Sequence, residues 1–126
     1  MAAPKFSILA IILLCSCAHS QPPKNVEVES LVDSCFTFGN IILDASKEPV
    51  LATASIIQKT MNADCPCKSA LMKYTAFQKK DGNTFNLLSS QFSILEKESV
   101  VLPIAVQKQL IFPDTPIHLS LYCSSN

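Results

Sequence analysis

Hydrophobic and polar residues alternate along much of the chain after residue 25, as in β-strands with one buried face. The clearest case is 117–123, where Ile117, Leu119, Leu121 and Cys123 alternate with polar or amphipathic residues. Further segments with strand character are 26–29, 35–38, 70–77, 85–95 and 100–106. This pattern predicts an all-β domain.

Turn signals separate these segments. Asp81-Gly82 predicts a tight hairpin between 70–77 and 85–95, because such turns need left-handed backbone conformations. Gly39-Asn40 is expected to end the segment 35–38, and 112–116 reads as a turn. The segment 50–60 fits either a strand or a helix. A helical turn is otherwise expected only within 41–47 or 54–61.

Several short strands between turns indicate an antiparallel sandwich or barrel. We expect an immunoglobulin-like sandwich of about seven short strands over residues 26–126, stapled by two disulfides. An immunoglobulin domain proper is a poorer match: the chain has no Trp, and Leu121 stands two residues before the last Cys, where that family has a Tyr. Pro103 lacks an N–H, so the strand at 100–106 is expected to lie at a sheet edge or to contain a bulge there.

The N-terminal segment reads as a secretory signal, with a basic start, a short apolar run and then small residues. Residues 1–16 form the expected signal peptide if Leu14-Cys15-Ser16-Cys17 is a bacterial lipobox, which makes Cys17 the lipidation site. The alternative is a signal at 1–20, cut after Ser20. Residues 17–25, which contain Pro22-Pro23, are expected to be a tether.

Four of the six cysteines lie beyond this segment, and an even number in a short exported chain predicts disulfides. A Cys65–Cys67 bridge is disfavoured because it closes a very small ring through Pro66. Two arrangements stay open. We prefer Cys67–Cys123 with Cys35–Cys65, because Cys67 precedes a central strand and Cys123 closes the last one.

Charge and missing motifs exclude several classes of function. The chain has 10 basic residues, all lysines, against 10 acidic ones. Without a basic block, nucleic-acid binding is not expected, and membrane contact should run only through a lipid on Cys17. No phosphate-binding glycine loop, G-x-S-x-G or H-E-x-x-H motif occurs, so we expect no enzyme activity and no cofactor.

Three features of the sequence could carry chemistry. Cys65 and Cys67 could form a redox pair beside Lys68, but bridging to Cys35 and Cys123 is the expected role. His118 lies on the polar side of the last strand and is expected to be solvated, since a lone His does not make a metal site. Glu27 and Glu29 share a strand face and are likewise expected to be solvated.

The order of three cysteine contexts resembles a family of small exported bacterial proteins of unknown function (domain of unknown function 2195). These contexts are Asp33-Ser34-Cys35, Cys65-Pro66-Cys67 and the terminal 116–123, so the resemblance covers most of the domain. It implies an exported location and no particular activity.

The expected function is a non-catalytic binding or interaction module of the bacterial envelope. Its location is the periplasm or, as a lipoprotein, the outer membrane, with secretion as the alternative. An unknown protein partner is expected to add a strand at an exposed sheet edge, for which 26–29 and 100–106 are the candidates. The alternatives are a passive structural lipoprotein and a thiol oxidoreductase that uses Cys65 and Cys67.

Overall fold

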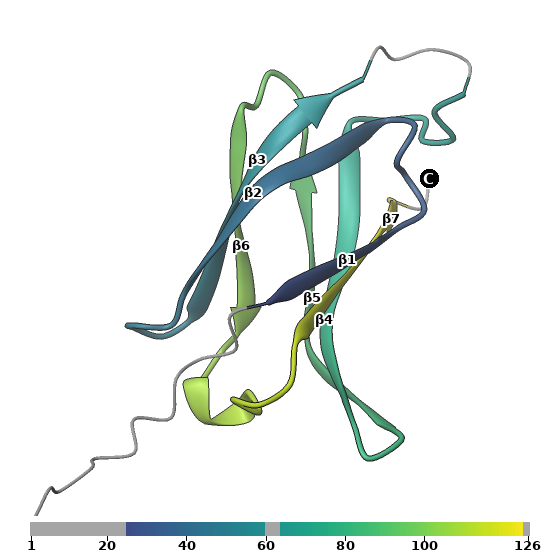
Figure 1. Ribbon diagram of the computed structural model, residues 1–126. Helices are drawn as coiled ribbons and strands as arrows, with labels where there is room; N and C mark the ends of the chain where they lie inside the picture. Colours follow the sequence, from purple (N-terminus) through teal and green to yellow (C-terminus); the bar gives the residue numbers. More distant parts are fainter. Residues whose placement is uncertain (1–24, 60–63, 125–126) are drawn as a thin grey trace, which may run out of the picture.

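The computed structural model describes residues 25–59 and 64–124, whose regular structure is seven β-strands and one short 3₁₀-helix (Figure 1). The strands are β1 (Val26–Ser30), β2 (Phe36–Asp44), β3 (Val50–Gln58), β4 (Leu71–Lys80), β5 (Asn83–Ser93), β6 (Ser99–Ala105) and β7 (Ile117–Cys123). The all-β prediction is therefore confirmed. The predicted signal, Cys17 and the tether up to residue 24 lie outside the described residues.

Two sheets face each other across a single core (Figure 1). One sheet has the strand order β1-β7-β4-β5 and the other β2-β3-β6. The fully or almost fully buried core side chains of the two sheets include Phe36, Val50, Ala52, Leu102 and Ile104 on one side and Met72, Tyr74, Ala76, Ile117, Leu119 and Leu121 on the other. The period-two pattern of the chain thus directs one face of each sheet inward.

The expectation of an entirely antiparallel arrangement is wrong at β1, which runs parallel to β7. Two parallel strands cannot be joined by a hairpin and need a long connection. β1 and β7 are the first and last strands of the domain, so the strands between them form this connection. The pairing places Glu27 opposite His118 and Glu29 opposite Ser120. The parallel pairing of β1 with β7 creates the polar cluster described below.

One open alternative is resolved and two local expectations are corrected. The ambiguous segment 50–60 forms a strand as far as Gln58, with Thr60 outside the described residues. The described parts of 41–47 and 54–61 contain no helical turn; the 3₁₀-helix lies instead at Lys108–Leu110. Gly39-Asn40 does not end its strand, because β2 continues to Asp44 through an irregularity in its pairing with β3.

That irregularity depends on Gly39. A Cβ at this position would overlap the Ser55 hydroxyl of β3. The same Ser55 oxygen accepts a hydrogen bond of 2.9 Å from the backbone N–H of Asn40. The missing side chain therefore lets Ser55 satisfy a backbone donor that the irregular pairing leaves unpaired.

The hairpin and edge predictions are confirmed. Asp81 and Gly82 have φ values of 52° and 78°, the left-handed conformations that a two-residue hairpin loop needs, and they join β4 to β5. β6, which contains Pro103, lies at one edge of the three-stranded sheet. Pro103 is tolerated there because an edge strand hydrogen-bonds on one side only.

Tyr74 joins the two sheets through the core. Its side chain is fully buried, and its hydroxyl donates a 2.6 Å hydrogen bond from β4 to the carbonyl of Pro103 in β6. Burial of the phenol raises the pKa of Tyr74 to about 12, because the apolar surroundings disfavour the anion. Tyr74 therefore acts as a neutral hydrogen-bond donor in the folded protein.

Gln78 fastens the loop that leads into β7. It is fully buried, and its amide nitrogen donates 2.9 Å hydrogen bonds to the carbonyls of Phe112 and Thr115. Its amide oxygen accepts a 2.9 Å bond from the N–H of Phe112. The Phe112 ring also packs edge-on against Phe85, with ring centroids 5.0 Å apart. This buried glutamine therefore replaces water for three backbone groups of an irregular segment.

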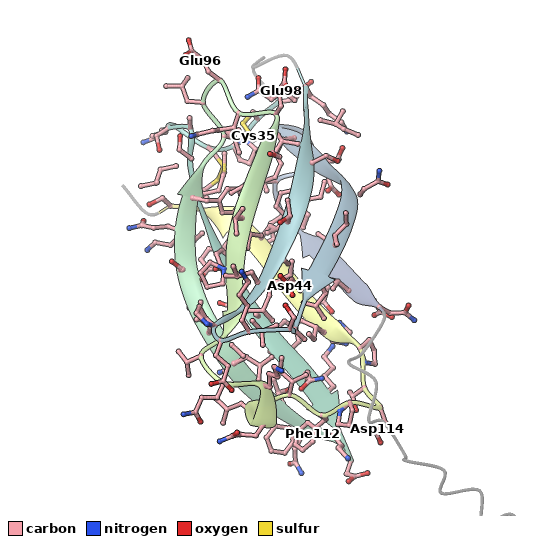
Figure 2. The ribbon with its side chains drawn as sticks, turned by 90° about the vertical axis from the view of Figure 1, so that its left-hand side faces the viewer. Cys35, Asp44, Glu96, Glu98, Phe112 and Asp114 are labelled. Atoms are coloured by element: carbon pink, nitrogen blue, oxygen red, sulfur yellow. A yellow bond between two sulfur atoms is a disulfide. The ribbon has the colours of Figure 1, made fainter. Side chains whose placement is uncertain are left out.

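Two disulfides staple the end of the sandwich opposite this loop. Cys35 pairs with Cys65 and Cys67 pairs with Cys123, the pairing preferred from the sequence. Figure 2 shows Cys35 at one end of the molecule and Phe112 with Asp114 at the other. Cys123 ends β7 and lies opposite Met72 in the β4–β7 ladder, so the second bridge joins the end of β7 to the segment just before β4.

Candidate functional site

The four described cysteines form two disulfides, and their sulfurs are crowded together. The sulfurs of Cys35, Cys65 and Cys67 lie within 4.8 Å of one another. Such a group could hold a soft metal only after reduction, because a bridged sulfur is not a thiolate ligand. Two disulfides in a domain of this size indicate an oxidising compartment. None of the helical structure in the described residues is long and apolar enough to cross a membrane.

A polar cluster lies on the outer face of the four-stranded sheet. Glu27 and Glu29 are two residues apart on β1, so both side chains leave the same face of that strand. The parallel pairing with β7 places His118 beside them. On the far side of β7, Phe77 of β4 lies opposite His118 in the ladder. Three strands thus bring one imidazole, two carboxylates and an aromatic ring to one place.

His118 is not solvated, contrary to the sequence-based expectation. It is only 8 % exposed, because its ring stacks on Phe77 with centroids 5.2 Å apart and an interplanar angle of 14°. Its Nδ1 lies 3.5 Å from Glu27 Oε2 and 3.5 Å from Glu29 Oε1. Nδ1 is buried and makes no hydrogen bond with any described residue. A buried nitrogen in this condition requires an explanation.

Lys79 completes the charge balance of this cluster. Its ammonium lies 3.5 Å from the Glu29 oxygen that faces His118, and 5.6 Å from the centroid of the Phe77 ring. The two side chains of the Lys79–Glu29 pair are about half exposed, so the pair is worth little in stability. The sequence showed the i, i+2 glutamates, but nothing in it placed the first strand beside the last.

The second candidate surface is a free strand edge. The outer strands of the two sheets are β1, β5, β2 and β6. β5 is the longest strand, with 11 residues, and its sequence NTFNLLSSQFS contains no charged residue and no proline. Natural edge strands usually carry such residues to prevent unwanted pairing. The sequence predicts edges only at 26–29 and 100–106. It does not reveal β5 as an edge, because the strand order of the sheet decides whether a hairpin strand has a second neighbour.

The outer face of the three-stranded sheet is also apolar in part. Ile42, Thr53 and Val101 lie in one row across β2, β3 and β6. Ile42 is 68 % exposed and Val101 54 % exposed. Because β6 is an edge strand, this row ends at another free edge. Nothing in the structure shows what covers the face.

An open hollow of about 990 Å³ lies near the β2–β3 turn and the 3₁₀-helix. Its lining includes both acidic and basic side chains, among them Asp44, Glu48 and Lys108. The carboxylate of Asp44 accepts hydrogen bonds from the hydroxyl and the N–H of Ser46, which lower its pKa. Glu48 likewise accepts from the N–H of Lys108. These groups are occupied with local bonds, so the hollow presents no convergent set for a ligand.

Comparison with protein-family models, curated proteins and solved structures finds no match to this chain. The resemblance to small exported bacterial proteins therefore stays a prediction.

Proposed function

We propose that this protein is a non-catalytic, exported binding module that takes an extended segment of a partner protein onto the free edge of β5. The observation that carries the proposal is the length and composition of that edge. Strand addition obtains its affinity from main-chain hydrogen bonds and its specificity from alternate side chains. An uncharged edge of 11 residues offers room for such a partner strand.

The other edges suit this role less well. β1 has five residues, two of them glutamates that face the His118 cluster. β6 contains Pro103, which removes a backbone donor from the strand. The pairing of β2 with its neighbour is irregular between Phe38 and Ile41, which distorts the strand. β5 also has an irregular pairing, but the run from Leu88 to Ser93 is regular.

The side chains of β5 define the chemistry of the partner. Its exposed residues include Phe85, Asn86, Ser89 and Gln91, which are apolar or neutral and hydrogen-bonding. They favour a partner segment with neutral polar and apolar residues at alternate positions. A segment rich in charge would lose hydration without finding a counter-charge on β5.

The finer topology that we propose is immunoglobulin-like. Immunoglobulin domains pair strand B with E in one sheet and C with F in the other. Here β3 pairs with β6 and β4 with β7, so β3, β4, β6 and β7 follow the same order along the chain. The four-stranded sheet adds β5 beside β4, which produces the free edge.

We further propose that the domain works in the bacterial envelope, anchored through an acylated Cys17. Two disulfides support an exported, oxidising location. An anchor followed by a tether would hold the module near membrane-associated partners and raise their effective concentration.

Site-specific photo-crosslinking in the native envelope tests the proposal. A crosslinker at Gln91 on β5 should capture one protein through an extended segment, and Asn86→Lys with Ser89→Lys should abolish capture by placing unpaired charge at the edge. Val101→Lys is the matched control, because Val101 is exposed on the opposite sheet at the edge strand β6. The proposal fails if the β5 double variant still captures the partner, if Val101→Lys alone abolishes capture, or if only dimers of this chain form.

A further inference from the structure

We propose that the segment taken up by β5 is a short strand whose alternate apolar side chains insert between β5 and β6 and close the core beside Ser90. The inference rests on the binding function proposed above and names the chemistry of its partner. β5 and β6 are edge strands of different sheets, and they contact each other on one flank of the sandwich (Figure 2).

The regular part of β5 sets the length of the partner strand. From Leu88 to Ser93 every residue has one direct neighbour on β4, whereas the pairing shifts just before Leu88. This run of six residues extends about 20 Å, at about 3.4 Å per residue. A partner strand laid along it therefore has three side chains on each face of the sheet.

The ladder with β4 shows which β5 side chains face the core. Ser90 lies opposite Tyr74 and Phe92 lies opposite Met72, and both β4 residues are fully buried. Directly opposite residues of an antiparallel pair point to the same face of the sheet, so Ser90 and Phe92 point inward. Phe92 is buried, but Ser90 is exposed. The inner side of the sandwich is therefore open to solvent at Ser90.

The surroundings of this opening are apolar. Leu88, two residues from Ser90 on the same side of β5, packs partly buried against the core. The hydrogen bond from Tyr74 to the carbonyl of Pro103 brings β6 to the level of Ser90, and Leu102 beside it is buried in the same core. An apolar side chain inserted from a partner strand would leave water for these surroundings, which is favourable in proportion to the apolar area buried.

Ser90 can be covered without leaving an unpaired polar group. Its side chain hydrogen-bonds the hydroxyl of Tyr74, so it already has a partner within the protein. Its small size leaves room for a larger side chain on the added strand, since directly opposite Cβ atoms are about 4.5–5.5 Å apart. On the outer face, the Ser89 hydroxyl is already paired with that of Thr75, 2.9 Å away. The inner face should therefore decide which segment binds.

Photo-crosslinking from Gln91 in the native envelope, followed by sequencing of the captured peptide, tests the inference. Gln91 points outward, so the residues on both sides of the crosslinked one should be apolar, because they would face Ser90 and Phe92. Ser90→Phe should reduce capture at least about tenfold, because the ring fills the space that the partner side chain needs. Ser90→Ala keeps that space, and Ser89→Phe places the same ring on the outer face, so both should capture within about twofold of the wild type.

The outcomes separate this inference from the function on which it rests. If the Gln91 crosslinker captures no partner, both fail. If it captures a partner and Ser90→Phe captures it equally well, strand addition at β5 stands and the apolar insertion is overturned. Charged residues on both sides of the crosslinked position would overturn it as well. Urea unfolding must show that Ser90→Phe is folded; if it is not, the sequence of the captured peptide decides.

Discussion

Replacing Gln78 with Met should destabilise the domain strongly, because it removes three buried hydrogen bonds at once. The side chain is fully buried and makes three hydrogen bonds of 2.9 Å with backbone groups of Phe112 and Thr115. Methionine has a similar length and volume but forms none of these bonds. The substitution therefore isolates the hydrogen bonds from the packing.

The magnitude follows from the number of bonds. Each hydrogen bond contributes about 0.5–1.5 kcal/mol net, and a backbone group left buried without a partner costs about 1–3 kcal/mol. Partial hydration of the released loop offsets some of this cost, so we expect a loss of about 3 kcal/mol. A domain of this size is stable by about 5–15 kcal/mol, so the effect is a large share of the total. The melting temperature should fall by about 12–24 °C.

Urea unfolding and calorimetry measure this loss, with Gln91→Met as the control. Gln91 is exposed on β5, so its substitution should stay within about 0.5 kcal/mol of the wild type. Gln78→Glu should be at least as damaging near neutral pH, because a carboxylate would face the two carbonyls that now accept bonds. A loss below about 0.5 kcal/mol for Gln78→Met would refute the reasoning, since water would then replace all three bonds.

Three further predictions follow from the core, the disulfides and the proposed anchor. Tyr74→Phe should cost about 1–2 kcal/mol near neutral pH by deleting the bond to β6. Because the pKa of Tyr74 rises from 10.0 to about 12 on folding, the wild type should also lose stability between pH 10 and 12. Urea unfolding should show that the Tyr74→Phe variant lacks this pH-dependent loss. Cys123→Ser should cost about 2–5 kcal/mol and leave one free thiol, at Cys67. Thiol titration and non-reducing peptide mapping measure this, and a peptide that links Cys67 to Cys35 would contradict the prediction. Cys17→Ser should release the protein from the membrane fraction, and a mature N-terminus found unmodified at Gln21 would exclude lipidation.

The strand content could be predicted because period-two alternation is a local property. Ile117–Cys123 alternates without interruption. A two-residue hairpin loop needs positive φ values, which Asp81 and Gly82 adopt more readily than most residues. The strand end predicted at Gly39 is wrong, because a glycine in the sequence indicates a turn or a bulge equally well, and only the contact with Ser55 of the neighbouring strand distinguishes them.

The sequence by itself determined the fold class and the capacity for two disulfides, since alternation, turn chemistry and cysteine content each depend on residues close together in the chain. Only the tertiary structure decided which strands are neighbours. The pairing of β1 with β7 joins Glu27 and Glu29 to His118, about 90 residues away, and turns an expected solvated histidine into a buried one. Sheet order likewise made β5 an edge and gave Gln78 its partners in the 108–116 loop. These contacts depend on the register and order of strands, which the side-chain period of any single strand does not specify.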